Sequence, residues 1–228
     1  MERSEIHILV ISFPVQGHIN PMLEFSKRLI SKGSVKVTLI TTNSALTSMH
    51  FQTNSSSTSI NIEAISDDYE DGEKNNFNEY FKCFETVFPQ SLTKLIEKHS
   101  SSPYPVKFLI YDSVLPWTLK VARKLGLDGA PFFTQSCAVN SIYCLYHQGR
   151  FEIPPRGSAG VVSLPCTSMP LLGFDDLPWF VHDNISYQGV RDVIFNQFSN
   201  IEEPNWLFCN TFDELEYEVT FNDSLLIS

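Results

Sequence analysis

The chain has 228 residues, of which 43% are hydrophobic and 18% are charged, and its formal net charge at pH 7 is −10. This length and composition are typical of a globular protein with a sizeable core, and the negative charge argues against nucleic acid or an anionic membrane as a partner, because both require a basic surface. The apolar run after the charged N-terminus is too short for a signal peptide or a membrane span, which predicts a cytoplasmic protein without membrane insertion.

Strands and helices are predicted to alternate along the chain. Short apolar runs rich in β-branched residues predict strands over residues 8–12, 35–41, 60–65, 107–111, 131–134 and 206–209. Apolar residues spaced three or four apart predict helices over residues 21–32, 76–99, 116–125, 136–147, 186–201 and 212–219. This order is typical of an α/β fold in which helices cover both faces of a parallel, Rossmann-like sheet.

The start of the first helix has a well-defined signal. Asn20 is expected at the N-cap and Pro21 at the first helical position, where no N–H is needed. Gly17 is expected to let the backbone turn tightly between the first strand and this helix. Farther along, an apolar stripe is interpreted as core packing, namely Phe77, Phe81, Phe84, Phe88, Leu92 and Leu95.

Three other segments are expected to be irregular. Residues 52–59 are rich in Ser and Asn and predict a loop. The acidic run 67–73 lacks the ligand pattern of an EF-hand and is interpreted as a solvated loop. Residues 150–178 are rich in Pro, Gly and Ser, and predict a long ordered loop of the kind that often carries binding residues. Five cysteines without CxxC spacing suggest neither a disulfide framework nor a zinc site, and no metal is expected.

Three polar residues follow predicted strands. His18 follows the first, Asp112 the fourth and Thr134 the fifth. Because the carboxyl ends of parallel strands share one edge, these side chains are expected to meet there. A histidine oriented by an aspartate can take a proton from a hydroxyl group at neutral pH. Two structural alternatives remain open: His18 can bond its own loop, and Asp112 can cap the helix that begins near Pro116.

Several motifs support a more specific hypothesis. They are residues 13–21 (Phe-Pro-Val-Gln-Gly-His-Ile-Asn-Pro), 111–113 (Tyr-Asp-Ser), 116–117 (Pro-Trp), 132–135 (Phe-Phe-Thr-Gln), 209–212 (Cys-Asn-Thr-Phe) and 214–216 (Glu-Leu-Glu). Together and in this order, they resemble the N-terminal part of the plant family-1 UDP-sugar-dependent glycosyltransferases. The resemblance is greatest to the branch that glucosylates hormones and other small acids or phenols. It covers the chain from residue 6 to about residue 219.

The resemblance implies the N-terminal half of a GT-B glycosyltransferase that moves glucose from UDP-glucose to a small lipophilic acceptor, with inversion at the anomeric carbon. The acceptor would be a phenol, an alcohol or a carboxylic acid. UDP-glucose would be a co-substrate, and no other cofactor or metal is implied. The matching residues would be His18 as base, Asp112 as its support, and Gly17 and Thr134 on the donor side. The residues expected by position to line the acceptor pocket, each of which can equally be core packing, are Val15, Gln16, Phe133, Gln135 and Tyr143.

One part of the family pattern has no counterpart in these 228 residues, namely the C-terminal signature that binds UDP and most of the sugar. We therefore expect residues 1–219 to form an acceptor-binding domain, residues 220–228 to be a tail that departs from the family, and the donor domain to be absent. Such a chain alone is expected to be inactive or weakly active. A non-catalytic acceptor-binding fragment is the alternative. A serine hydrolase or a nicotinamide enzyme is disfavoured, because neither G-x-S-x-G nor G-x-G-x-x-G occurs.

Overall fold

The computed structural model describes residues 6–48, 60–66, 77–165, 169–182, 188–216 and 219. The predicted loops 52–59 and 67–73 and the predicted tail 220–228 lie outside these residues. The chain divides into two compact units. The first comprises Met1–Thr134 and Pro204–Leu207, and the second comprises Gln135–Glu203 and Phe208–Ser228. The predicted domain 1–219 contains parts of both.

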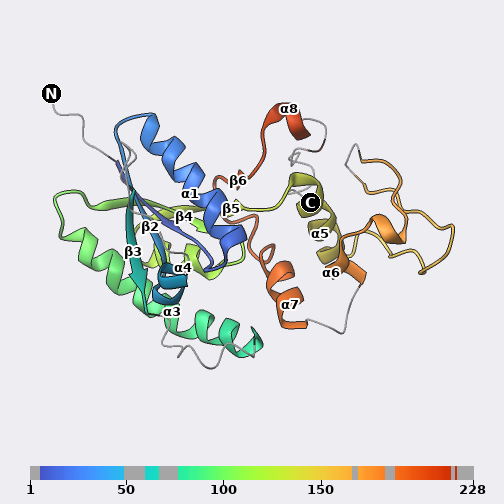
Figure 1. Cartoon of the computed structure of the whole chain (residues 1–228), viewed down its shortest axis with the longest axis horizontal. Coiled ribbons are helices and arrows are strands. Elements are labelled where there is room, and N and C mark those ends of the chain that lie inside the picture. The colour runs from blue at the N-terminus through green and yellow to red at the C-terminus, as the bar shows by residue number, and fades with distance from the viewer. Residues whose placement is uncertain are drawn as a thin grey trace. The chain divides into compact units, whose positions relative to one another are not determined.

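A parallel sheet forms the centre of the first unit (Figure 1). Its strands are β1 (Ile6–Ile11), β2 (Val35–Thr42), β3 (Asn61–Ile65), β4 (Val106–Asp112) and β5 (Asp128–Phe133). They lie in the order β3-β2-β1-β4-β5. The chain thus moves outward from β1 on one side and from β4 on the other, so the strand order reverses between these two neighbours. Open α/β sheets bind their ligands at this switch point, beyond the carboxyl ends of the strands.

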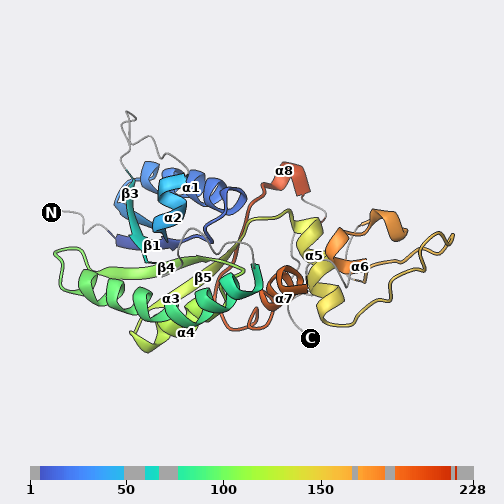
Figure 2. The ribbon, with the colours of Figure 1, turned by 60° about the horizontal axis from the view of Figure 1, so that its bottom comes forward.

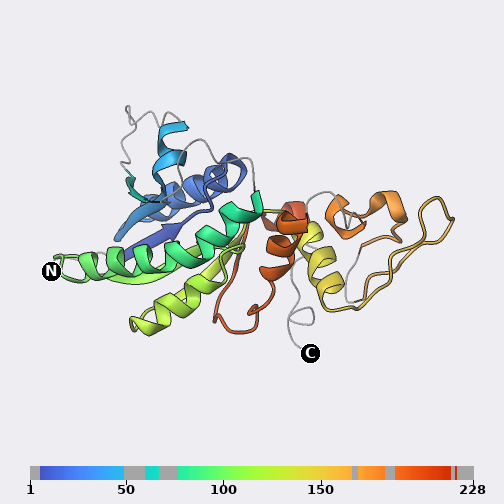
Figure 3. The same cartoon turned by 90° about the horizontal axis from the view of Figure 1, so that it is seen from below.

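Helices cover both faces of this sheet, as the predicted Rossmann-like fold requires. Figures 2 and 3 show α1 (Gln16–Ser31) and α2 (Asn43–Ser48) on one face, with α3 (Phe77–Ser100) and α4 (Trp117–Lys124) on the other. Because both faces are covered, Leu9, Val10 and Ile11 of the central strand β1 are fully buried. The parallel α/β fold class is confirmed.

The start of α1 differs from the prediction. The helix begins at Gln16, so Asn20 and Pro21 lie within it rather than at its N-cap and first position. The carbonyl oxygen of Val15 accepts hydrogen bonds from the backbone N–H of both His18 and Ile19, each at 2.9 Å. Pro21 lies in the second turn, where its missing N–H removes one hydrogen bond of the helix, but the helix continues to Ser31. As a result, His18 lies in the first turn of α1.

Aromatic residues of α3 form much of the core on its face of the sheet. Phe81, Phe84, Phe88 and Leu92 are buried, which confirms that this stripe is core packing. The rings of Phe84 and Phe88 stack with their centroids 4.0 Å apart. At the C-terminal end of the stripe, Ile96 is buried in place of the predicted Leu95, which is half-buried.

The second unit contains mainly helices and connecting segments. Its elements are α5 (Cys137–His147), η1 (Phe174–Asp176), α6 (Trp179–His182), α7 (Gln188–Asn196), β6 (Phe208–Cys209) and α8 (Asp213–Glu216). Helix α5 begins as predicted, because Ser136 is its N-cap and accepts a hydrogen bond from the backbone N–H of Val139. The carboxylate of Glu216 accepts two more bonds there, from the N–H groups of Cys137 and Ala138. The predicted loop 150–178 holds η1 and a bridge between Val162 and Leu172.

No helix in the part of the chain that the structure describes is long and apolar enough to cross a membrane.

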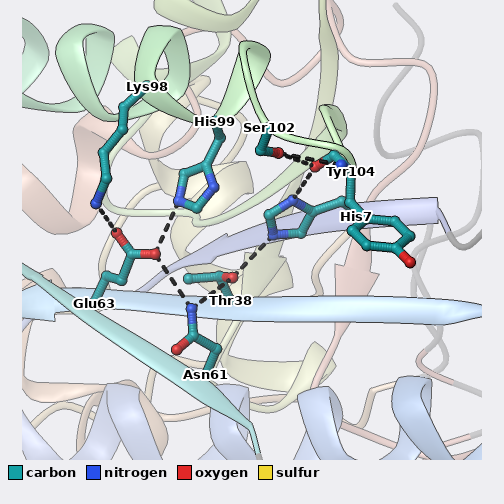
Figure 4. A network of polar contacts seen from close by, with 8 residues as sticks. All are labelled: His7, Thr38, Asn61, Glu63, Lys98, His99, Ser102 and Tyr104. Carbon is teal, nitrogen blue, oxygen red and sulfur yellow. Dashed lines mark hydrogen bonds and ion pairs between the residues drawn. The ribbon is translucent and has the colours of Figure 1, made fainter.

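A polar network joins the first three strands of the sheet to the end of α3 (Figure 4). His7 Nδ1 lies 2.9 Å from the carbonyl oxygen of Tyr104, and its Nε2 lies 2.9 Å from Thr38 Oγ1. Since a carbonyl oxygen only accepts, Nδ1 carries the proton, and the neutral ring accepts from the Thr38 hydroxyl at Nε2. Next to it, Glu63 Oε1 lies 2.9 Å from His99 Nε2, and Glu63 Oε2 lies 3.3 Å from Lys98 Nζ. The two hydrogen bonds of His7 fit a neutral ring.

The balance of burial and neighbouring groups lowers the pKa of His7. Burial lowers the pKa of His7 from its ordinary value, and the nearby Lys36 and His99 lower this pKa further. These effects outweigh the Tyr104 carbonyl group and Glu63, which raise it. The unfolded chain therefore takes up a proton at His7 at a higher pH than the folded chain does. This contribution to stability is complete above the unfolded pKa of 6.5 and declines as the pH falls below it.

We expect the free energy of unfolding to fall between pH 6.5 and pH 5.5, with His7 contributing at most about 1.4 kcal/mol, the limit for one group over one pH unit. Urea titrations of the wild type and of His7→Gln measure it. The free energy of unfolding of the variant should be lower than that of the wild type at pH 6.5. It should fall less than that of the wild type between pH 6.5 and pH 5.5. His18 acts in the opposite sense in both proteins and cancels in the comparison. Equal losses would show that His7 is not the group responsible.

Candidate active site

The switch point of the sheet brings His18 and Asp112 together. His18 lies in the first turn of α1, directly after β1, and Asp112 is the last residue of β4. Since β1 and β4 are hydrogen-bonded neighbours, their carboxyl ends are adjacent. His18 Nδ1 lies 2.8 Å from Asp112 Oδ2, although the two residues are 94 positions apart in the sequence. The predicted pair therefore forms.

The carboxylate of Asp112 is fully buried and is compensated by hydrogen bonds. Its Oδ2 accepts from the backbone N–H of Phe13 at 3.2 Å, in addition to His18, and its Oδ1 accepts from the N–H of Val114 at 3.3 Å. A buried carboxylate without such partners would be strongly destabilising. Asp112 does not cap α4, whose N-cap is Pro116 with no side-chain capping bond. The capping alternative is therefore wrong.

The electrostatics of His18 suit a base. Burial lowers the pKa of His18, but the adjacent charge of Asp112 and its hydrogen bond outweigh burial, so the pKa of His18 is raised above its ordinary value. An ionised carboxylate only accepts, so Nδ1–H donates to Asp112. Nε2 is then the ring nitrogen that can take up a proton. The side chain of His18 is 24% exposed, which leaves it accessible to a substrate.

Thr134 joins the pair. It directly follows β5, and its Oγ1 lies 3.4 Å from His18 Nδ1. This distance is long for a hydrogen bond, so the contact is a weak one beside the 2.8 Å bond to Asp112. The structure thus brings His18, Asp112 and Thr134 to one edge of the first unit, which is the convergence that the strand order predicted.

The remaining predicted residues of the first unit lie close to these in the chain. Val15 and Gln16 are exposed at the start of α1, whereas Phe133 is fully buried at the end of β5. Gly17 lies within α1, and its φ is not positive, so its expected role in a tight turn is wrong. A Cβ atom added at Gly17 would meet no heavy atom within 4 Å, which leaves open space beside His18.

Gln135 and Tyr143 belong to the second unit. Tyr143 is buried in α5, where its ring packs edge-on against Phe195 of α7, and burial raises the pKa of Tyr143 to about 12. Gln135 Oε1 is buried without a hydrogen-bond partner among the residues that the structure describes.

Sequence reasoning missed two contributors to the site. Phe13 belongs to a motif that predicts no role for it, and no sequence pattern points to Val114. Both donate backbone N–H groups to Asp112, and every residue except proline carries such a group, so no side-chain pattern could have identified them. In the described ranges, no group of three or more His, Cys, Asp or Glu residues is arranged to hold a metal ion.

The chain was compared with known proteins. No family model matches it. It is 45% identical over 220 residues to mogroside I-E synthase from Siraitia grosvenorii, covering 96% of this chain and 47% of that protein. It is 41% identical to UDP-glucosyltransferase 74AE2 from Panax ginseng, covering 94% of this chain and 46% of that protein. The chain thus spans about half the length of the curated relatives it matches.

Solved structures show the same relationship. Os79 from O. sativa in complex with UDP has a TM-score of 0.74 and 29% identity, over 93% of this chain and 47% of that one. Os79 in complex with U2F and trichothecene has a TM-score of 0.76 and 30% identity, over 93% of this chain and 48% of that one.

We expect His18 to titrate above pH 6.5 in the wild type and below it in Asp112→Asn, because the variant keeps the burial that lowers the pKa of His18 and loses the charge that raises it. Histidine-selective NMR titration measures both. His7, at the amino end of β1, is the internal control, and its titration should be the same in both proteins. A wild-type His18 that titrates below pH 6.5 would contradict the assignment.

Proposed function

Because this chain belongs to the plant UDP-glycosyltransferases and corresponds to their N-terminal part, we propose that it supplies the acceptor-binding half of a glucosyltransferase. In this proposal, glucose moves from UDP-glucose to a hydroxyl or carboxyl group of a small lipophilic acceptor. The observation that carries the proposal is the His18–Asp112 pair at the switch point of the sheet. The pKa of His18 is raised above its ordinary value and its side chain is partly exposed, and both properties suit a base.

The proposed chemistry is a single displacement. The acceptor oxygen forms a bond to the anomeric carbon of glucose while the bond from that carbon to the UDP oxygen breaks. UDP leaves with the electron pair, and the proton of the acceptor hydroxyl passes to His18 Nε2. Attack opposite to the leaving group inverts the anomeric carbon. Positioning the two reactants in line contributes to the rate together with the base.

Asp112 would serve this step by stabilising the charged ring. Its hydrogen bond holds the proton of the neutral ring on Nδ1 and leaves the Nε2 lone pair for the acceptor. When Nε2 takes up a proton, the buried carboxylate balances the new charge. The N–H groups of Phe13 and Val114 keep the carboxylate in place during this change.

Binding roles for the other residues are part of the same proposal. Gly17 and Thr134 would lie on the donor side, where the open space beside Gly17 and the hydroxyl group of Thr134 suit a sugar. The proposed acceptor-lining residues are Val15, Gln16, Phe133, Gln135 and Tyr143. No metal is required, because the base and the alignment of the reactants supply the proposed chemistry.

The decisive experiment is a transfer assay with UDP-glucose and a phenol whose pKa lies well above the assay pH. It uses the 228-residue chain and, in parallel, the same chain joined to the remaining C-terminal part of the Siraitia grosvenorii relative. Calorimetry with the phenol measures acceptor binding separately. Transfer by either form supports the proposal. Acceptor binding without transfer in both forms would favour the non-catalytic alternative.

In the form that is active, His18→Ala should lower kcat by about two to four orders of magnitude, because a general base contributes that much. Asp112→Asn should lower kcat less, since the base remains. KM for the acceptor should change little in either variant, because the lost interaction belongs to the transition state. Steady-state kinetics with the phenol measure these values.

His147→Ala is the control, because His147 is an exposed histidine of the second unit. An acceptor that is already ionised, such as a carboxylate, needs less help from a base and should show a smaller loss. Near-normal turnover of the phenol by His18→Ala would refute the role of His18.

A further inference from the structure

We propose that Phe13 is a positioning residue that orients the imidazole of His18 and holds Asp112. This inference rests on the proposed function, in which His18 is the base. The Phe13 ring lies against the imidazole with centroids 5.5 Å apart and planes at 71°. Its backbone N–H donates to Asp112 Oδ2, the same oxygen that accepts from His18 Nδ1. A single residue thus contacts both members of the pair.

The Phe13 ring is itself firmly held. Its side chain is only 3% exposed. It stacks on Phe81 with centroids 4.9 Å apart and planes nearly parallel, at 2°. Phe84 packs against another part of the ring, with centroids 5.5 Å apart and planes at 63°. Close packing of this kind leaves little freedom for ring motion. Residues of α3 therefore fix the Phe13 ring, and the Phe13 ring in turn contacts the imidazole of His18.

The imidazole needs such support because rotation about its Cβ–Cγ bond is soft and roughly two-fold. A half-turn would replace Nδ1 by a carbon atom beside Asp112 and would turn Nε2 away from its proposed position. The hydrogen bond to Asp112 selects one orientation, and the edge-to-face contact with Phe13 blocks movement away from it. Removing the Phe13 ring while keeping its backbone N–H should let the imidazole of His18 adopt the other orientation more often.

The first test measures the tautomer of neutral His18 in the 228-residue chain. Nitrogen-15 NMR at a pH above the titration of His18 distinguishes Nδ1–H from Nε2–H. We expect the Nδ1–H form to dominate in the wild type and the fraction of Nε2–H to rise in Phe13→Leu.

Phe88→Leu is the matched control. Phe88 is 1% exposed and belongs to the same aromatic stripe of α3, but its ring packs on Phe84 and Trp117 rather than on Phe13 or His18. It should keep the wild-type tautomer. An unchanged tautomer in Phe13→Leu would overturn the proposal, and so would an equal change in both variants.

The second test uses the form of the chain that transfers glucose. Phe13→Leu should lower kcat for the phenol about 2- to 10-fold, the contribution of one aromatic pair, with KM unchanged. Phe88→Leu should keep both values. A rise in KM alone, or equal losses in both variants, would mean a general packing defect and would overturn the positioning role. Absence of transfer by the wild type would count against the proposed function, whereas the NMR test would still decide the role of Phe13.

Circular dichroism establishes that each variant folds. If Phe13→Leu does not fold, Phe13→Met, which is unbranched and adapts to irregular space, replaces it under the same criteria.

Discussion

The buried carboxylate of Asp112 is the constraint on which the arrangement of the site depends. A charged group with no exposure to water must be compensated by neighbouring donors. Here the donors come from different segments: His18 from α1, Phe13 from the turn before it and Val114 from the turn after β4. To satisfy Asp112, the loops that follow β1 and β4 must therefore approach each other closely. The histidine is placed by the same requirement.

This constraint explains why the site lies where the strand order reverses. On either side of the switch point the chain continues in opposite directions across the sheet, from β1 to β2 and from β4 to β5. The carboxyl ends of these two strands are hydrogen-bonded neighbours, and open α/β sheets bind their ligands beyond such ends. The pair is thus held at the ends of two neighbouring strands, with the His18 side chain partly exposed.

The two histidine environments of the first unit show how position in the sheet sets protonation. His7 lies at the amino end of β1 near Lys36 and His99, and its hydrogen bonds fit a neutral ring that donates from Nδ1. His18 lies beyond the carboxyl end of the same strand beside a buried carboxylate. Burial lowers the pKa of both rings, but only His18 has a partner whose charge outweighs burial. The same residue type therefore serves structure at one end and suits chemistry at the other.

The sequence by itself determined the alternation of strands and helices, the family, and the candidates His18, Asp112 and Thr134, because apolar periodicity and local motifs are properties of neighbouring residues. Tertiary structure decided the rest. The prediction placed the start of α1 at Pro21, whereas the backbone after Phe13 forms helical hydrogen bonds from Val15 onward. Phe13 gained its place beside His18 only through packing against α3, far along the chain. Its backbone N–H on Asp112 could not be read from any residue type, because almost every residue carries this donor and only the folded chain aims it.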